Sequence, residues 1–347
     1  MKPFFLIWLT VCTLVTVVYP ASEYQVLRKI PIAGDGNWDY VSADSVNRRL
    51  YVSHGTELEV LDLDSGEIVG KLIPPTTENA PTPMLTHGAA VAPDLGLGFT
   101  SNGAASSTTI FDLKTLKTLA EVKLNGAPDG FLYDPSSRRA FLFSARTEDA
   151  TAVDGVQRKV TGTIPLGGKP EAATSDEKGH LFVNIEDKDL VLELDAKKLT
   201  VMESWPVAPC REPASMAIDA RNQRIFVGCR NQLMVVMNTN NGQVITKLPI
   251  GELTDAAVFD PQGSLIFSSN GDGTLTVIQE ESPTRYTVVD NVKTEFGART
   301  MAIDLKTHRL FLSLADRRNI PAPGTLNQNL RPEIIPGTFK VLVVGKN

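Results

Sequence analysis

The stretch "NWDYVSADSVNRRLYVSHGTELEVLDLDSGEIVGKL", residues 37–72, contains four short apolar runs separated by polar turns. Val, Leu, Ile and Tyr dominate the runs, whereas Asn, Asp, Ser and Gly mark the turns between them, which is typical of antiparallel strands. The apolar residues do not recur every three to four positions, as they would in an amphipathic helix. The stretch therefore predicts one small antiparallel sheet of four strands.

The second of these strands returns seven times along the chain, always as a short apolar run after a polar turn. Its starting position moves forward by 40 to 47 residues each time, which matches the period of propeller blades. The seven copies begin at Leu50, Leu97, Phe141, Leu181, Ile225, Leu265 and Leu310. Four antiparallel strands repeated at this period predict an all-β fold, a seven-bladed β-propeller.

The last unit lacks a fourth strand, because the chain ends soon after "GTFKVLVVG", residues 337–345. The segment "EYQVLRKIPI", residues 23–32, precedes the first unit and can supply the missing strand. Pairing of the N- and C-terminal strands in the last blade would close the ring without an open sheet edge. Residues 22–347 are therefore expected to form a single propeller domain.

The N-terminus has the features of a secretory signal peptide. Lys2 precedes an apolar run over residues 4–18, and the small residues Ala21 and Ser22 follow. The run is shorter than the roughly 20 residues needed to cross a bilayer. We predict a signal peptide over residues 1–21, a periplasmic or secreted mature protein, and no integral membrane association after cleavage. An uncleaved N-terminal anchor is the alternative, and lipidation at Cys12 is less favoured.

Export to an oxidising compartment would allow the remaining cysteines to form a disulfide. Removal of the signal peptide leaves Cys210 and Cys229, both expected near the same face of the fifth blade. An even pair in an oxidising compartment predicts a disulfide, with two free thiols as the alternative.

Two segments carry a family resemblance: "YVSHGTELEVLDLDSGEIVGKL", residues 51–72, and "GKPEAATSDEKGHLFVNIEDKDLVLELDAKKL", residues 168–199. They resemble the exported YVTN-repeat (YncE-like) β-propeller proteins, and the resemblance extends over residues 23–347. It implies a soluble exported propeller. It implies no catalytic set, so no site residue follows from it.

Propeller geometry assigns the polar residues to faces. The loops that lead into the first strands and the loops after the second strands share one face. Counting five residues back from the Asp that ends each first strand gives the channel mouth, except in the second blade, where the spacing differs and the equivalent residue is His87. These positions are Asp39, His87, Asp129, Glu171, Ala214, Asp255 and Arg299.

Four carboxylates and one histidine around one axis suit a hard cation or a polar ligand. The candidate metal ligands are Asp39, His87, Asp129, Glu171 and Asp255. The alternative is that these side chains only solvate the rim of the channel. The second loops of the same face carry His54, Asn102, Arg146, Glu186, Arg230 and Asn270. His54 joins the candidate site, whereas His180 and His308 fall in turns of the opposite face.

Two long insertions, residues 73–86 and 315–336, belong to the face of the channel mouth. The first functional hypothesis is therefore an exported binding or scaffold protein for an unknown small ligand or protein partner. The second is a metal-dependent enzyme resembling lactonases or lyases, with a channel-bound divalent cation as the suggested cofactor and His87 or His54 as general base. The net charge of −6 and the lack of a basic stripe argue against nucleic acid.

Overall fold

The computed structural model describes residues 23–75, 86–322, 324–326 and 332–347. The predicted signal peptide, residues 1–21, and Cys12 lie outside the described residues. No helix in the described part of the chain has the length and apolar character that a membrane span needs.

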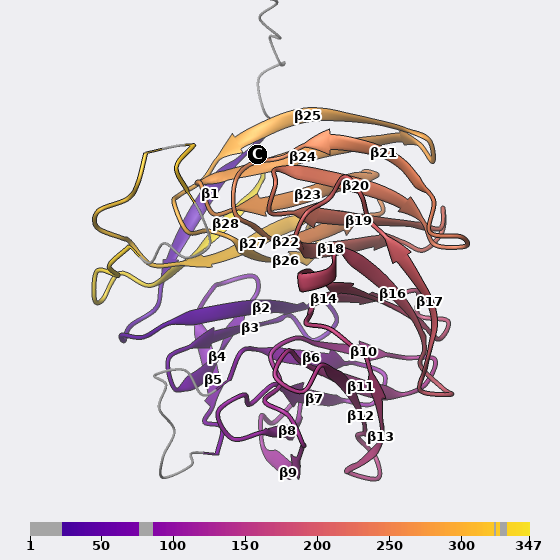
Figure 1. Cartoon of the computed structure of the whole chain (residues 1–347). Helices are drawn as coiled ribbons and strands as arrows, with labels where there is room; N and C mark the ends of the chain where they lie inside the picture. Colours follow the sequence, from indigo (N-terminus) through magenta and orange to yellow (C-terminus); the bar gives the residue numbers. More distant parts are fainter. Residues whose placement is uncertain (1–22, 76–85, 323, 327–331) are drawn as a thin grey trace, which may run out of the picture.

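Seven antiparallel sheets of four strands form a ring, and the first strands of the blades gather around its centre (Figure 1). This arrangement confirms the predicted seven-bladed propeller. Blades 1 to 3 are formed by β2 (Trp38–Asp44), β3 (Arg49–His54), β4 (Glu57–Asp62) and β5 (Ile68–Leu72); β6 (Ala89–Ala92), β7 (Leu97–Thr100), β8 (Ser107–Asp112) and β9 (Thr118–Lys123); β10 (Phe131–Asp134), β11 (Arg139–Ser144), β12 (Asp149–Asp154) and β13 (Lys159–Pro165).

Blades 4 to 6 follow the same order. Their strands are β14 (Pro170–Ser175), β15 (His180–Ile185), β16 (Leu190–Asp195) and β17 (Thr200–Pro206); β18 (Pro213–Asp219), β19 (Arg224–Cys229), β20 (Leu233–Asn238) and β21 (Val244–Pro249); β22 (Thr254–Asp260), β23 (Leu265–Asn270), β24 (Thr274–Ser282) and β25 (Arg285–Lys293). A single turn of 3-10 helix, η1 (Glu186–Lys188), follows β15.

The seventh blade joins the two ends of the chain. It contains β26 (Thr300–Asp304), β27 (Arg309–Leu314), β28 (Lys340–Lys346) and β1 (Tyr24–Pro31). β1 pairs with β28 in antiparallel register from Tyr24 opposite Lys346 to Pro31 opposite Lys340. The predicted closure of the ring by its terminal strands is therefore confirmed. Because every blade now has four strands, no sheet is left incomplete at the junction.

The Asp that ends each first strand has a structural role. Asp44 Oδ1 accepts the backbone N–H groups of Val46 and Asn47 at 3.0 and 2.9 Å. Asp134 and Asp219 accept equivalent bonds in their own turns. A carboxylate that caps a turn in this way replaces the backbone partners that the turn lacks. The repeated Asp of the sequence therefore shapes turns and leaves the channel mouth to other residues.

The core lies between neighbouring blades, where the second and third strands bury their side chains. The largest fully buried residues include Phe99, Phe141, Phe182, Phe226 and Phe311, one from the second strand of each of five blades. Burying a Phe side chain contributes about 1.5–3 kcal/mol. The repeated Phe explains why the second strand is the most regular part of each unit in the sequence.

A disulfide joins Cys210, in the loop before β18, to Cys229 at the end of β19. Both residues are buried, and 19 positions separate them in the sequence. A cross-link that closes a loop of this length contributes about 3 kcal/mol in the chain-entropy description. It fastens the loop leading into the fifth blade to the strand beside it.

Candidate functional site

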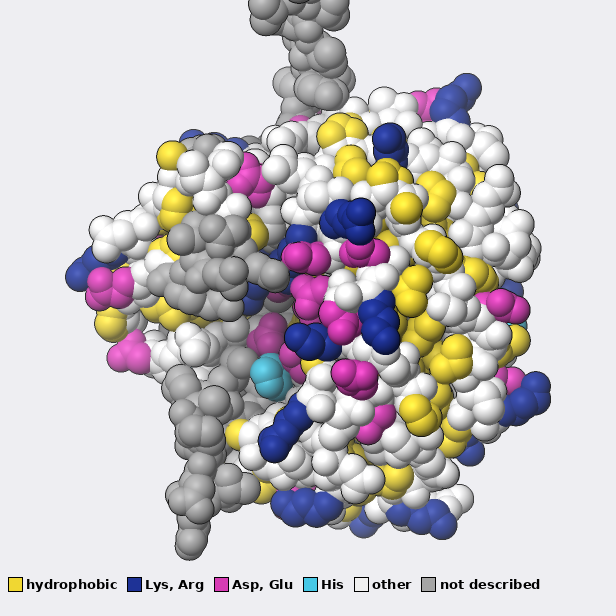
Figure 2. Space-filling model, viewed as in Figure 1, with side chains coloured by type: hydrophobic (Ala, Val, Ile, Leu, Met, Phe, Trp, Pro, Cys, Tyr) yellow, Lys and Arg dark blue, Asp and Glu magenta, His cyan; other side chains and the backbone are white. Residues whose placement is uncertain are grey.

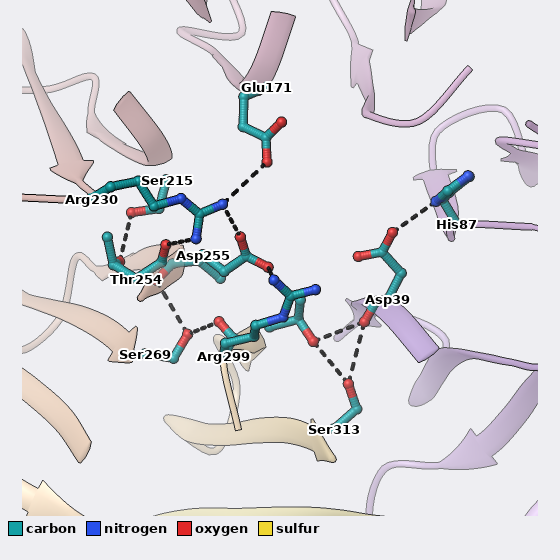
Figure 3. Close-up of polar contacts among 12 residues, drawn as sticks. Asp39, His87, Glu171, Ser215, Arg230, Thr254, Asp255, Ser269, Arg299 and Ser313 are labelled. Atoms are coloured by element: carbon teal, nitrogen blue, oxygen red, sulfur yellow. Dashed lines mark hydrogen bonds and ion pairs between the residues drawn. The ribbon is translucent and has the colours of Figure 1, made fainter. Parts of the chain in front are cut away.

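Charged side chains from six blades meet where the inner strands begin (Figure 3). Asp39, Glu171 and Asp255 lie near the starts of β2, β14 and β22. Arg299 directly precedes β26, and His87 and Asp129 lie two residues before β6 and β10. In space-filling view, acidic and basic side chains gather around a histidine on this face (Figure 2). Ala214, at the corresponding position of β18, adds no charge.

The first cluster, here called the Asp–His group, contains Asp39, His87 and Asp129. His87 Nδ1 lies 2.8 Å from Asp39 Oδ2 and 3.2 Å from Asp129 Oδ1. One potential ligand atom from each residue lies within 4.8 Å of the others. One imidazole nitrogen therefore faces two carboxylates.

The two carboxylates keep His87 protonated at neutral pH. Burial alone would lower the pKa of His87, but the charge of Asp129 and the hydrogen bond to Asp39 outweigh burial and raise it to about 9. Burial also raises the pKa of Asp129 above its usual range, and the positive charge of His87 opposes that shift. An imidazolium between two carboxylates satisfies part of their negative charge.

Backbone contacts hold His87 in this position. Its N–H donates to Ser101 O at 2.9 Å, and its carbonyl accepts the N–H of Tyr40 at 3.0 Å. Gly103 packs over the ring, because a Cβ at that position would lie 2.7 Å from His87 Nε2. The loop after β7 can therefore approach the imidazole only with glycine at this point.

The second cluster, here called the arginine group, contains Glu171, Glu186, Arg230, Asp255 and Arg299. Asp255 bridges the two arginines: its Oδ1 lies 3.0 Å from Arg230 Nη2 and its Oδ2 lies 3.3 Å from Arg299 Nη1. The charge of Asp255 is the main cause of the raised pKa of Arg299. A buried carboxylate with two guanidinium partners is well compensated.

Arg230 also reaches the two glutamates of this group. It lies 3.9 Å from one carboxylate oxygen of Glu171 and 3.9 Å from one of Glu186. Burial and the neighbouring carboxylates nevertheless raise the pKa of Glu171 well above its usual range. Two of the five predicted metal ligands, Glu171 and Asp255, thus contact arginine, and the other three form the Asp–His group.

Buried hydroxyl groups fix the backbone under both clusters. Thr300 Oγ1 donates to Asp39 O at 2.8 Å, and Ser53 Oγ accepts the Asp39 N–H at 2.8 Å. Ser269 Oγ donates to Arg299 O in the same way. Such bonds satisfy backbone N–H and C=O groups that have no partner within the short inner strands. The backbone that carries the charged side chains is therefore held in place.

An aromatic pair lies in the channel next to these charges. Tyr40 of the first blade and Phe131 of the third meet edge to face, with ring centroids 5.4 Å apart. Gly88 of the intervening blade makes room, because a Cβ there would lie 2.5 Å from the Phe131 ring. Burial, followed by the charges of Asp129 and Glu171, raises the pKa of Tyr40 well above its usual range. The rings therefore lie close to the carboxylates.

His54 lies away from the channel mouth, which corrects the sequence-based expectation. It is only 5% exposed and stacks on Phe339 with ring centroids 4.0 Å apart. Together with Gly34, Gly36 and Ile334 it lines a cavity of about 200 Å³ at the seam between the first and seventh blades. Burial lowers its pKa. His54 ends β3, one strand farther from the axis than Asp39 in β2.

Sequence reasoning left Arg230, Glu186 and Tyr40 out of the candidate site. The sequence places Arg230 and Glu186 in the second loops of this face but does not give the distance of their side chains from the axis. The length of the Arg230 and Glu186 side chains is the signal that could have found them. A long side chain at the end of a second strand can still reach the channel mouth. Most of the insertion at residues 73–86 lies outside the described residues.

The opposite-face histidines behave as ordinary turn residues. His180 Nδ1 lies 2.9 Å from Asp176 Oδ2, and His308 Nδ1 lies 3.0 Å from Asp260 Oδ2. Asn102 and Asn270 of the mouth face are buried and bond to Thr109 and Thr276. These residues stabilise turns and strands.

The sequence matches no family model and no curated protein sequence. Solved structures do resemble the fold. A structure described as Kuenenia stuttgartiensis hydrazine synthase has a TM-score of 0.68 at 13% identity, over 81% of this chain and 94% of that one. A mitotic checkpoint complex structure has a TM-score of 0.70 at 14% identity, over 90% and 94% of the two chains. RRP9 WD40 repeats have a TM-score of 0.74 at 8% identity, over 94% and 99%. At these identities the similarity establishes the β-propeller fold alone.

Proposed function

We propose that this protein is an exported binding protein of the YVTN-repeat (YncE-like) type, periplasmic or secreted, whose channel mouth holds a small polar ligand. The apolar N-terminal run and the resemblance of the repeats support export. The observation that carries the ligand site is the meeting of charged side chains from six of the seven inner-strand positions on one face.

The balance of charge favours a ligand with a positive group. Five carboxyl groups, two guanidinium groups and one imidazole make up the two clusters. Burial among like charges raises the pKa values of Asp129 and Glu171. Because the cations present do not fully compensate these acids, an added positive charge would be stabilised there.

The test is a thermal-shift screen of the mature chain, residues 22–347, against cationic, anionic and zwitterionic small molecules, with calorimetry on each hit. We expect Asp129→Asn to weaken cationic and zwitterionic hits about tenfold, and Arg299→Gln to weaken anionic and zwitterionic hits by a similar factor, since each removes the oppositely charged partner. His180→Gln, on the opposite face, is the matched control and should bind like the unchanged protein. Hits that bind both mouth variants at full affinity would contradict the proposal.

The Asp–His group supports a second candidate, a metal-dependent lactonase- or lyase-like enzyme. Asp39, His87 and Asp129 each offer one ligand atom within 4.8 Å of the others. If the cation displaced the Nδ1 proton of His87, this nitrogen and two carboxylate oxygens would suit Zn²⁺ or Mn²⁺. Such a cation would supply Lewis-acid chemistry at the mouth, while these three side chains would hold it.

Metal analysis of the purified protein tests this candidate, together with a thermal shift after dialysis and addition of Zn²⁺, Mn²⁺, Ca²⁺ or Mg²⁺. We expect Asp39→Asn and Asp129→Asn each to abolish the shift. No metal and no shift would exclude the enzyme hypothesis and leave the binding protein unaffected.

A further inference from the structure

Exposure separates two of the charged groups at the channel mouth from the rest. The Asp129 side chain is 42% exposed and the Arg299 side chain is 41% exposed. The other members of both clusters are between 8% and 24% exposed. Asp129 and Arg299 are therefore the most exposed charged side chains of the mouth; Asp129 directs its buried Oδ1 toward His87 and leaves the rest of its side chain toward solvent.

Each exposed group makes the longer of the two contacts to its central partner, which is His87 for Asp129 and Asp255 for Arg299. Asp129 lies 3.2 Å from His87, whereas Asp39 lies 2.8 Å from the same nitrogen. Arg299 lies 3.3 Å from Asp255, whereas Arg230 lies 3.0 Å away. Asp129 and Arg299 can thus turn to a ligand while His87 and Asp255 keep their closer partners. No buried charge is left unpaired by that exchange, which would otherwise be costly.

The accessible groups also lie on opposite sides of the ring. Asp129 leads into the third blade and Arg299 leads into the seventh, so three blade steps separate them one way and four the other. The Phe131 ring, two residues after Asp129, meets Tyr40 in the channel beside them. An aromatic surface next to a carboxylate favours an ammonium group through cation–π attraction.

From this arrangement we propose that the ligand is a linear zwitterion that spans the channel mouth. Its ammonium group pairs with Asp129 beside the Tyr40–Phe131 pair, and its carboxylate pairs with Arg299. A simple cation or anion satisfies only one of the two accessible groups. This inference rests on the proposed binding function and names the ligand class of that same site.

A series of ω-amino carboxylates of increasing length measures the distance that a ligand must bridge between Asp129 and Arg299. The probes are glycine, 4-aminobutanoate, 6-aminohexanoate and 8-aminooctanoate, with hexylammonium and hexanoate as single-charge controls, all titrated by calorimetry. We expect affinity to peak at one chain length. At that length the zwitterion should bind about tenfold more tightly than either single-charge control, because one charge-assisted contact is worth about one decade of affinity.

Two variants assign the ends of the ligand. Arg299→Gln should reduce the affinity of the best zwitterion to that of hexylammonium, and Asp129→Asn should reduce it to that of hexanoate. His180→Gln again serves as the control, and the unfolding midpoint of each variant confirms that it folds.

The outcomes distinguish this inference from the function on which it rests. If hexylammonium binds as tightly as the best zwitterion and Arg299→Gln changes nothing, the mouth is a cation site and the zwitterion is excluded. If every ω-amino carboxylate fails while other classes bind in the wider screen, the zwitterion alone is excluded. If neither experiment finds a ligand, both proposals are wrong.

Discussion

His87 and His54 lie on the same face of the propeller, yet their surroundings act on them in opposite directions. His87 sits between two carboxylates, and its pKa is raised to about 9. His54 stacks on Phe339 at the seam of the ring, and burial lowers its pKa. The face of a propeller therefore does not determine what a histidine does; the charge of its partners and its distance from the axis do.

The same contrast holds for the channel mouth and the seam as a whole. At the seam, Phe339 packs against His54 and Trp38, and Arg317 lies over the Trp38 ring at 5.0 Å. These contacts close the ring. At the mouth, ion pairs replace apolar packing and two charged side chains stay accessible. Substitutions at the seam should therefore change stability, whereas substitutions at the mouth should change binding and pH dependence.

Phe339→Ala should have the largest effect on stability. Phe339 is buried at the junction of the chain ends, and its loss leaves a cavity, so we expect a decrease of about 3–5 kcal/mol in the free energy of unfolding. Phe131→Ala, in the partly exposed channel, is the matched control and should cost less. Urea unfolding of both variants measures the difference. An equal or smaller loss for Phe339→Ala would show that the seam is not a main determinant of stability.

His87 should make the free energy of unfolding decrease strongly as the pH becomes alkaline. Its pKa is raised from 6.5 to about 9 on folding, so its contribution is fully present below pH 6.5 and is lost as the pH rises through 9. The shift corresponds to about 3 kcal/mol. Unfolding free energies between pH 6 and pH 10 should fall more steeply for the unchanged protein than for His87→Gln. Parallel curves would contradict the pairing of His87 with both carboxylates.

Gly103→Ala should disturb the mouth without touching its charges. The added Cβ would lie 2.7 Å from His87 Nε2 and 3.0 Å from Pro128 O, so we expect a loss of about 1–3 kcal/mol. Displacement of the ring from Asp39 should also lower the pKa of His87, as measured by NMR titration. An unchanged pKa would mean that the loop after β7 does not position the imidazole.

His54→Gln should have the smallest effect on stability. The stability that His54 contributes is lost at acidic pH, whereas that of His87 is lost at alkaline pH. Because burial lowers the pKa of His54 in the folded chain, stability is lost as the pH falls below 6.5 through the folded pKa. The variant should lose less stability than the unchanged protein between pH 7 and pH 5. A steeper acid loss in the variant would indicate that His54 is charged in the folded protein.

The repeat predicted the fold in detail, because each blade makes mainly local antiparallel pairs. Strand spacing also put His87 at a position equivalent to Asp39, despite the irregular spacing of the second blade, and the structure brings these two side chains together. Its contact with Asp39 joins equivalent positions of neighbouring blades, but the repeat alone does not specify which side chains meet there. Ring closure followed from a missing strand at one end and an unpaired strand at the other.

His54 and Arg230 could not be placed in the same way. Sequence position within a blade gives the face of a loop, but the distance of a side chain from the axis depends on packing between blades. His54 is held by Phe339, 285 residues further along the chain. Arg230 reaches the mouth because Asp255 and Thr254 of the next blade accept its guanidinium hydrogen bonds. Such long-range partners are not encoded in the repeat pattern.

The central claim is that the channel mouth binds a ligand. The protein has only four histidines, so NMR can follow the imidazole signals of His87 and His54 separately during titration with the tightest-binding ω-amino carboxylate. We predict that the His87 signal shifts and saturates with the ligand while the His54 signal stays in place. A saturating shift of His54, or no shift of His87, would contradict the account.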